Sequence, residues 1–290
     1  MRIERLAVIG VGLIGGSCAL ALKRAGAVGR VVGVGRGRAN LERALALGVV
    51  DETSQDAAEG VRDADAVLVS APVGQFPALF AAIAPALAPG AFVTDGGSTK
   101  QDVVEAARAG LGAVLPRFVP AHPIAGAEAS GAQSARAELF EGRNVVITPL
   151  PETDACCIQR VQQFWEACGA RVSSMTPEEH DALFAAVSHL PHLLAYALVA
   201  TVAQRPDAAR LFGFAASGFR DFTRIASSSP EMWRDILVAN RRAVMAEIDH
   251  YQDALEGLRA MLASRDAHAL EAVLALARDA REAWIRGGDR

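Results

Sequence analysis

The feature that most constrains the fold is a glycine-rich segment near the N-terminus. Residues 8–17 read VIGVGLIGGS, with Gly10, Gly12 and Gly15 in the spacing G-x-G-x-x-G. The apolar residues 6–9 predict a buried strand before the motif, and residues 17–25 predict a helix after it. In that setting the glycines permit a tight turn, close approach of a pyrophosphate and close helix packing. The segment therefore predicts a dinucleotide-binding domain, with an ordinary strand-turn-helix as the alternative.

The end of the second predicted strand, residues 30–34, bears on which dinucleotide is bound. A carboxylate that binds the ribose 2′-OH is expected about 20 residues after the third glycine. Gly35 stands there instead, followed by Arg36 and Arg38. Arginines pair with a 2′-phosphate, so NADP is favoured over NAD unless both form only a solvated turn. The expected cofactor contacts are Gly10, Gly12, Leu13, Ile14, Gly15, Arg36, Arg38, Ser70 and Pro72.

Composition excludes several classes of protein. The chain has 290 residues, 51% hydrophobic and 21% charged, which is enough for two domains with cores. The net charge is −4 and the basic residues are dispersed, so no nucleic-acid partner is expected. Four cysteines without C-x-x-C spacing predict reduced core thiols of a cytoplasmic protein, with neither a disulfide framework nor a zinc site.

Two stretches without Asp, Glu, Lys or Arg, residues 66–94 and 182–204, resemble membrane spans in composition. Prolines and glycines interrupt the first. The second contains His189, Pro191 and His192, which favours burial inside the protein or in a dimer. No signal peptide is visible, since the N-terminal apolar run is the glycine motif. We therefore expect a cytoplasmic protein with no membrane partner.

Strands and helices alternate up to residue 174, which predicts an α/β, Rossmann-like doubly wound sheet over residues 1–174. The predicted strands are residues 6–9, 31–34, 66–70, 91–94, 118–120, 145–148 and 170–173, and the main helices are 39–47, 99–109 and 154–168. Residues 175–290 predict an all-helical domain, with helix starts at Thr176-Pro177 and Ser229-Pro230. After the second start, apolar residues recur every seven positions. This stripe is often plain core, but its length favours dimerisation.

Two polar clusters follow predicted strands at the carboxyl edge of the sheet. Ser98 lies in DGGSTK and, with Gln101, predicts a capping box; its hydroxyl could also meet substrate or nicotinamide. His122 lies in AHPIAGAE, where it is placed to accept a proton, although a lone histidine is usually structural.

A third cluster lies in the helical part, where His180 precedes Asp181 and where His189 and His192 share a helix face. Zinc is a rival explanation for these histidines, but no H-E-x-x-H motif supports it, and no metal is expected. Arg224 lies in DFTRIA among apolar neighbours, which suits either binding of a carboxylate or an ion pair within the protein.

Taken together, these segments resemble the prephenate/arogenate dehydrogenase family of tyrosine biosynthesis. The matching blocks span nearly the whole chain in order: GVGLIGGS at 10–17, DGGSTK at 95–100, HPIAGAEASG at 122–131, SHLPH at 188–192 and GFRDFTRIA at 218–226.

The resemblance implies oxidative decarboxylation of a cyclohexadienyl acid, and the apolar stripe of the C-terminal helices favours a homodimer. Prephenate would give 4-hydroxyphenylpyruvate and arogenate would give tyrosine, while NAD(P) takes a hydride from the ring carbon bearing the hydroxyl. His122 would help to remove the hydroxyl proton and Ser98 would orient that hydroxyl. The other roles implied are substrate contacts or supporting positions at Arg224, His192, Glu128, His180 and Asp181.

Two rival functions remain at this point. A β-hydroxyacid-type dehydrogenase also joins a dinucleotide domain to a helical one, but it needs a helix-borne lysine in the second domain. Lys100 is the last lysine of this chain and is expected to be a helix-entry charge. A non-catalytic, NADP-binding sensor dimer would bind cofactor without turnover.

Overall fold

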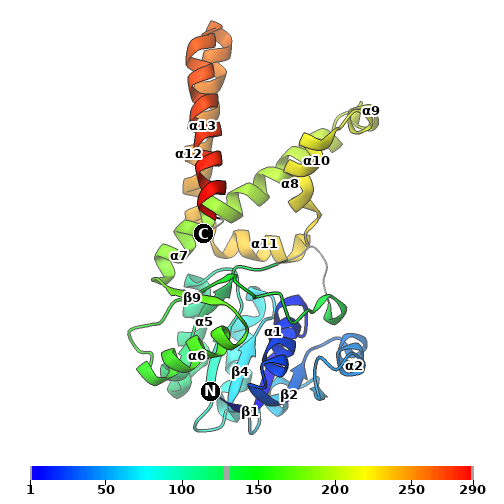
Figure 1. Cartoon of the computed structure of the whole chain (residues 1–290), viewed down its shortest axis with the longest axis vertical. Coiled ribbons are helices and arrows are strands. Elements are labelled where there is room, and N and C mark those ends of the chain that lie inside the picture. The colour runs from blue at the N-terminus through cyan, green and yellow to red at the C-terminus, as the bar shows by residue number, and fades with distance from the viewer. Residues whose placement is uncertain (1, 127–130, 289–290) are drawn as a thin grey trace. The chain divides into compact units, whose positions relative to one another are not determined.

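A six-stranded parallel sheet organises the first part of the molecule, in the order β3-β2-β1-β4-β5-β6 (Figure 1). The computed structural model describes residues 2–126 and 131–288 and divides into two units, Met1–Arg241 and Arg242–Arg290. The six strands are β1 (Ile3–Ile9), β2 (Val28–Val34), β3 (Glu52–Ser54), β4 (Ala66–Val69), β5 (Phe92–Asp95) and β6 (Phe118–Val119). This arrangement confirms the predicted α/β class.

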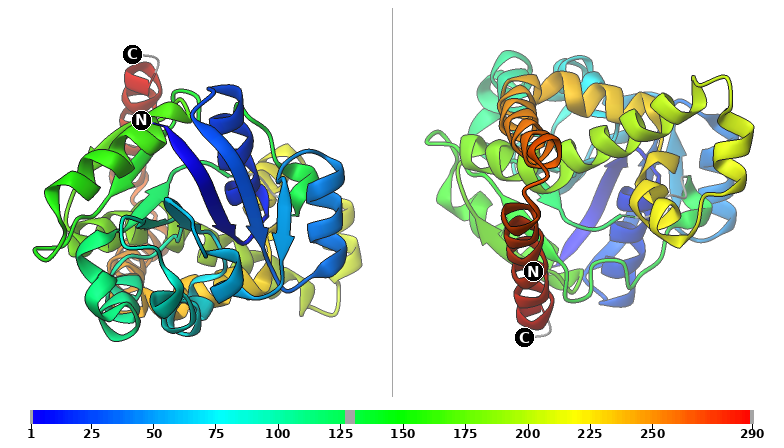
Figure 2. Two further views of the ribbon diagram at one scale, coloured as in Figure 1. Left: turned by 90° about the horizontal axis from the view of Figure 1, so that it is seen from below. Right: turned by 90° about the horizontal axis from the view of Figure 1, so that it is seen from above.

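Both faces of the sheet are covered, because side chains alternate along each strand. On β1, Leu6 and Val8 enter one core, and Ala7 and Ile9 enter the other. Helices α1 (Leu13–Arg24) and α6 (Ala155–Ala167) supply the first core. Helices α4 (Phe76–Ile83) and α5 (Gln101–Gly110) supply the second. Figure 2 shows the strands running between these helical layers.

The later strands do not join this sheet. A second sheet has the order β7-β8-β9, with β7 (Ala121–Pro123) antiparallel to β8 (Asn144–Ile147) and β9 (Arg171–Ser174) parallel to it. The sequence predicted β8 and β9 but missed β7 and β3, which have three residues each. Strands this short carry too few residues for a periodic signal.

Only helices follow β9 in the described residues. They are α7 (Pro177–Phe184), α8 (Leu190–Ala203), α9 (Ala208–Gly213), α10 (Ser217–Thr223), α11 (Pro230–Ala239), α12 (Arg241–Ser264) and α13 (Ala267–Gly288); α2 (Arg38–Ala46) and α3 (Ala57–Gly60) lie in the first part. Both predicted helix starts are confirmed, since Thr176 forms a capping box and Ser229 caps α11. The apolar stripe that follows Ser229 does not lie on one continuous helix, because the chain breaks at Asn240 between α11 and α12. The domain boundary between residues 174 and 175 stays a prediction.

Part of the apolar stripe on α12 is exposed within one chain: Tyr251, Leu255 and Leu262 are 36%, 48% and 64% exposed, whereas Val244 is buried. Among the described residues, one helical stretch, Pro177–Ala203, is long and apolar enough to cross a membrane by length and composition. Only 28% of its most apolar window is buried within the chain. Burial inside a single chain therefore does not explain the apolar composition of this stretch. Burial in a dimer is the other explanation that the sequence suggested.

Candidate active site

The glycine loop has the geometry that its spacing predicts. Gly10 has φ +95°, and a Cβ there would lie 2.6 Å from the carbonyl oxygen of Ser70. A Cβ on Gly15 would lie 2.4 Å from the carbonyl oxygen of Gly10. At Gly12, in contrast, a Cβ would meet nothing within 4 Å. Gly12 therefore faces open space directly before α1, where helix N–H groups can receive a pyrophosphate.

Ser70 supports this loop rather than pointing away from it. Its Oγ donates to the carbonyl oxygen of Gly10 at 2.7 Å. Asn40, which the sequence did not indicate, donates to the carbonyl oxygen of Val11 at 2.7 Å. Both side chains hold the loop that would receive the cofactor. The remaining expected contacts lie at the same edge: Leu13 and Ile14 open α1, and Pro72 is exposed after β4.

Arg36 and Arg38 follow the end of β2 and are both exposed. Arg38 forms an ion pair with Glu42, with 2.8 Å between Nε and Oε1. Such an exposed pair is weak and can be replaced by a stronger anion. Among the described residues, the side chain of Arg36 has no ion-pair partner. Arg36 is thus the more available of the two cations.

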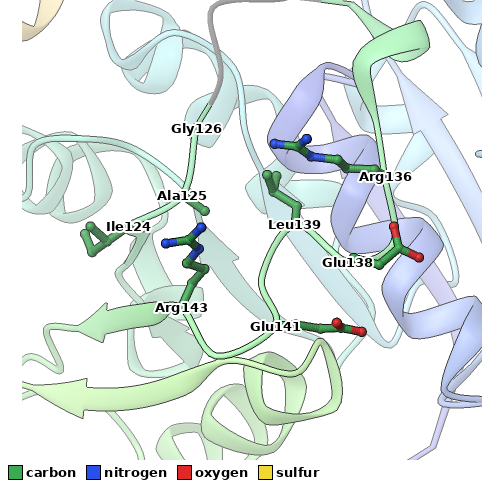
Figure 3. A pocket seen from close by; sticks show the side chains of 8 residues that line it. All are labelled: Ile124, Ala125, Gly126, Arg136, Glu138, Leu139, Glu141 and Arg143. Carbon is green, nitrogen blue, oxygen red and sulfur yellow. The ribbon is translucent and has the colours of Figure 1, made fainter. Parts of the chain in front are cut away.

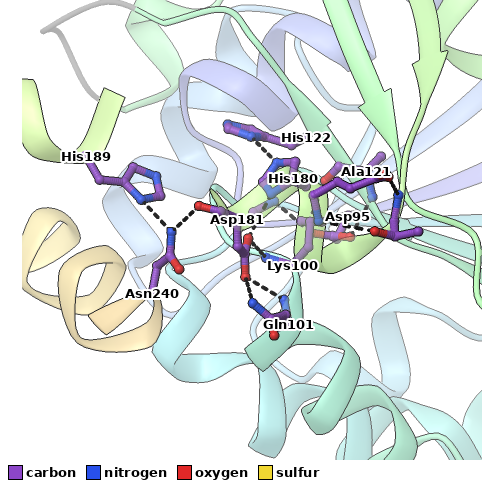
Figure 4. A network of polar contacts seen from close by, with 12 residues as sticks. Asp95, Lys100, Gln101, Ala121, His122, His180, Asp181, His189 and Asn240 are labelled. Atoms are coloured by element: carbon purple, nitrogen blue, oxygen red, sulfur yellow. Dashed lines mark hydrogen bonds and ion pairs between the residues drawn. The ribbon is translucent and has the colours of Figure 1, made fainter. Parts of the chain in front are cut away.

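Two histidines and a carboxylate form a continuous chain of hydrogen bonds (Figure 4). His122 on β7 and His180 on α7 are joined through Nδ1 and Nε2 at 2.8 Å. The Nδ1 of His180 lies 2.8 Å from Oδ1 of Asp181. His180 and Asp181 are buried, whereas His122 is half-buried.

This series of hydrogen bonds determines which nitrogen of each ring carries the proton. An ionised carboxylate only accepts hydrogen bonds, so Nδ1 of His180 donates to Asp181. Neutral His180 then accepts at Nε2, and Nδ1 of His122 must be the donor in that bond. The Nε2 of His122 is consequently an acceptor with a free lone pair. The geometry supplies a base at that nitrogen.

The surroundings keep this base neutral. Burial lowers the pKa of His122 well below its usual range, and electrostatic interactions with His180, Lys100 and His189 lower it further. Burial also lowers the pKa of His180. For Asp181, burial alone would raise the pKa, but hydrogen bonds from His180 and from two backbone N–H groups outweigh burial and lower it.

Those backbone N–H groups belong to Lys100 and Gln101, which donate to Asp181 at 2.8 and 2.9 Å. Asp181 thus caps the N-terminus of α5 from another helix. The predicted capping box of Ser98 with Gln101 is wrong, since α5 starts at Gln101 and no side chain of its own segment caps it. The correction leaves the Ser98 hydroxyl available for another role.

A π-helical segment, Ala185–His189, separates α7 from α8 and places His189 toward the same network. Nδ1 of His189 accepts from the Asn240 side chain at 3.0 Å, and that amide also donates to the carbonyl oxygen of Asp181 at 2.8 Å. His189 also forms a hydrogen bond to the backbone of Ser98. Burial lowers the pKa of His189 to about 4, so the ring is neutral and joins Ser98 to Asp181.

His192 and Arg224 lie in the helical part of the first unit. Nδ1 of His192 donates to the carbonyl oxygen of Ser188 at 2.9 Å, which leaves Nε2 as an acceptor. Its ring stacks on Trp233 with 3.6 Å between centroids. Burial lowers the pKa of His192, and the nearby charge of Arg224 lowers it further. His192 and Arg224 therefore interact electrostatically.

Comparison with known proteins identifies the family. Residues 18–174 match the family described as prephenate dehydrogenase, nucleotide-binding domain, and residues 176–276 match prephenate dehydrogenase, dimerization domain. The chain belongs to the prephenate dehydrogenase family. It is 36% identical to the cyclohexadienyl dehydrogenase of Zymomonas mobilis over 91% of this chain and 90% of that protein.

Solved structures of this family share the fold. A. aeolicus prephenate dehydrogenase, solved with hydroxyphenyl propionate and NAD+, is 36% identical with a TM-score of 0.91, covering 97% of this chain and 98% of that one. Synechocystis arogenate dehydrogenase is 29% identical with a TM-score of 0.80, covering 97% and 100% of the two chains. The expectation drawn from the sequence blocks is confirmed at the level of family and fold.

Some expectations for this prephenate dehydrogenase family member are corrected or lie outside the structure. Cys156 is exposed, so it is not a core thiol, while Cys18 and Cys168 are buried with their Sγ atoms 3.6 Å apart. Asp154, Cys156 and Cys157 group their ligand atoms within 4.8 Å, and this group includes none of the histidines. Glu128 lies outside the described residues.

A cavity of about 470 Å³ lies beside the segment that follows His122. Ile124, Ala125 and Gly126 form one side of it, and Arg136 and Arg143 extend toward it from the other (Figure 3). Among the described residues, none of those expected to bind substrate or cofactor lines this cavity. It takes no part in the site proposed below.

Sequence reasoning missed several residues that complete the site of this family member. Asp95, Asn240 and Trp233 were given no role, His189 was noted only for the helix face that it shares with His192, and Lys100 was expected at a helix entry. Lys100 is in fact fully buried, with its Nζ on Oδ2 of Asp95 at 2.5 Å. The spacing of Asp95 and Lys100, five positions apart across two glycines, was the only sequence signal for this ion pair. The same spacing is compatible with an exposed ion pair and with a buried one.

Proposed function

We propose that this chain oxidatively decarboxylates prephenate, arogenate or both, with NAD(P) as hydride acceptor, in tyrosine biosynthesis. The main support is the series of hydrogen bonds from Asp181 through His180 to His122, which leaves Nε2 of His122 unprotonated. Family membership over both matched segments supports the reaction class. A base directed at a ring hydroxyl is what this reaction requires of the protein, because aromatisation makes the remaining chemistry strongly downhill.

The glycine loop fits a dinucleotide. Open space in front of Gly12 lies at the N-terminus of the 12-residue helix α1, and crowding at Gly10 and Gly15 keeps the backbone close. Bound there, the nicotinamide supplies the hydride acceptor. Ser70 and Asn40 maintain the shape of the loop, and Ser98 lies at the end of β5, on the same edge of the sheet.

His122 acts as general base in this proposal. Its Nε2 accepts the hydroxyl proton of the substrate as the ring carbon loses its hydride, and the positive charge is shared with His180 and balanced by Asp181. Ser98 orients the same hydroxyl. Because His122 must be unprotonated, the rate falls as pH decreases through its lowered pKa.

We assign Arg224 to a substrate carboxylate and His192 to the substrate side chain. Replacing Arg224 by Gln should raise the KM for the cyclohexadienyl acid by about 10- to 100-fold, since a charged hydrogen bond contributes about 1.5–3 kcal/mol. The KM for the cofactor should stay unchanged. Steady-state kinetics of R224Q beside R210Q, an exposed arginine on α9, measures this, and equal KM values for both variants would refute the assignment.

NADP preference over NAD is also part of the proposal. Arg36 is exposed at the end of β2, and Gly35 offers no carboxylate to repel a 2′-phosphate. Replacing Arg36 by Ala should raise the KM for NADP about tenfold or more and leave the KM for NAD within about twofold. A parallel loss for both cofactors, or for neither, would show that Arg36 forms only a solvated turn.

Absorbance at 340 nm tests the reaction itself, with prephenate and arogenate each combined with NADP and NAD. Turnover in any of the four combinations supports the reaction class, and the fastest identifies the preferred substrate and cofactor. A folded dimer that binds cofactor but is silent in all four would contradict the proposal and favour a sensor.

The match to a dimerization domain supports a homodimer, and the exposed apolar residues of α12 are consistent with one. A cytoplasmic location follows from the expected biosynthetic role and is part of the proposal. The stretch Pro177–Ala203 carries His180, Asp181, His189 and His192, so we assign it to the active site and not to a membrane span. Sedimentation of the purified chain without detergent tests whether it is a dimer and whether it stays in solution without a membrane.

A further inference from the structure

Lys100 is one of two lysines in the chain, and its side chain is fully buried. Its Nζ donates to Oδ2 of Asp95 and to the carbonyl oxygen of Ala121, at 2.5 and 2.7 Å. Every partner of the Asp95 carboxylate is a donor, including the N–H groups of Gly97 and Ala121, which indicates the ionised form. Buried ion pairs seldom increase stability over an apolar pair of similar size, so a different role is indicated.

The pair holds the backbone next to His122. Ala121 donates its N–H to Oδ1 of Asp95 at 2.9 Å, and its carbonyl oxygen accepts from Lys100. Ala121 lies on β7, an edge strand of the small sheet, so no neighbouring strand is available on that side. The Asp95–Lys100 pair replaces that strand and fixes the peptide that carries His122.

The backbone of Lys100 contacts Asp181, at the other end of the hydrogen-bond series from His122. Its N–H donates to Oδ1 of Asp181 at 2.8 Å, the same oxygen that lies 2.8 Å from Nδ1 of His180. Lys100 therefore contacts both the residue before His122 and the carboxylate that orients His180. One residue connects the two ends of the chain from Asp181 to His122 (Figure 4).

Lys100 also places a positive charge beside both histidines. Among the described residues, the charged and titratable groups around His122 are His180 on α7, His189 on the π-helical segment and Lys100 before α5, with Asp181 and Asp95 bound to His180 and Lys100. A nearby cation disfavours protonation of an imidazole. Burial is the largest cause of the lowered pKa of His122, and the Lys100 charge acts in the same direction.

We propose that Lys100 is a positioning residue for the general base: through Asp95 and Ala121 it fixes His122, and its charge lies beside that imidazole. This inference rests on the proposed role of His122 in the reaction. A purely structural lysine would affect folding and rate, whereas a charged positioning residue also affects the pH dependence of the base.

The test is Lys100→Met, which keeps the length and apolar stem but removes the charge. We expect kcat to fall about tenfold or more, and the acid limb of kcat/KM to move up by about half a pH unit to one unit. Lys23→Met is the matched control, since Lys23 likewise donates to a carboxylate (Asp51, 2.7 Å) and a backbone carbonyl (Gly48, 3.0 Å). It should leave both quantities unchanged.

If Lys100→Met does not fold, Asp95→Asn/Lys100→Met leaves no unpaired buried charge and should show a smaller upward shift, because the Asp95 anion is removed together with the Lys100 cation. An NMR titration of the His122 imidazole, assigned by its absence in His122→Asn, reads the shift without turnover. A folded variant with an unmoved acid limb and an unmoved His122 titration would overturn the proposal, even if its rate is reduced. Silence of the wild-type enzyme with both substrates would instead refute the proposed function, while the NMR titration would still test Lys100.

Discussion

Replacing His122 by Asn should lower kcat by about 10²- to 10⁴-fold, the usual contribution of a general base. Asn retains a hydrogen-bond acceptor near the substrate hydroxyl but cannot take its proton. Binding should be affected far less, so that KM for substrate and cofactor changes little. Steady-state kinetics at the pH optimum measures this, with thermal unfolding to confirm that the variant is folded.

The pH profile gives this prediction its direction. His122 works as the neutral imidazole, and its pKa is lowered well below the usual range by burial and by electrostatic interactions with His180, Lys100 and His189. The wild-type rate should therefore stay high at pH 6.5 and fall only in stronger acid. In His122→Asn that acid limb should disappear. His250→Asn is the control, because the side chain of His250 is 75% exposed.

An undiminished kcat in His122→Asn would remove His122 from the mechanism. A reduced kcat that keeps the wild-type acid limb would assign the titrating group to another residue. His189, with a pKa of about 4, is the next histidine in the same network.

Replacing Asp181 by Asn should cost nearly as much, although Asp181 is placed one histidine away from the base. The amide offers one acceptor where the carboxylate offers two, and its NH₂ cannot accept from His180. His180 is then free to donate through Nε2, which forces Nδ1 of His122 to accept and leaves the proton on Nε2 of His122. Loss of the correct tautomer in a carboxylate–histidine pair lowers kcat by up to about 10⁴.

The same substitution weakens the cap on α5, because Lys100 and Gln101 both donate backbone N–H groups to Asp181. Loss of a cap costs about 1 kcal/mol, so Tm should fall modestly. Asp56→Ala is the matched control, since Oδ1 of Asp56 accepts from the N–H of Glu59 at 2.9 Å and caps α3, and Ala cannot cap. The control should lower stability without lowering kcat. If Asp181→Asn lowered Tm but left kcat within twofold, tautomer control would be refuted.

Local patterns predicted much of the fold. The glycine spacing placed the first strand and helix, and the helix starts at Thr176 and Ser229 are those of the structure. Such signals succeed because the interacting groups lie within about four residues of one another. The family blocks also located His122, and the adjacent pair His180-Asp181 was noted in the helical part, but the contacts between them were not predicted.

The failures share one cause. Ser98 and Gln101 have capping-box spacing, yet Asp181 caps α5 from 81 residues away in the chain. Lys100 has the position of a helix-entry charge, yet it is buried on Asp95 and Ala121. At both sites a distant residue competes successfully with the local partner, and spacing in the sequence contains no information about that competition.

The sequence by itself determined the class of fold, the cofactor loop and the identity of the candidate base, because each depends on residue type and short-range spacing. Only the tertiary structure decided which nitrogen of His122 is free. That property depends on a hydrogen bond between residues 58 positions apart and on a carboxylate that orients the second histidine. The proton on an imidazole follows from its partners in space, and these partners meet only when α7 packs beside β7 and α5.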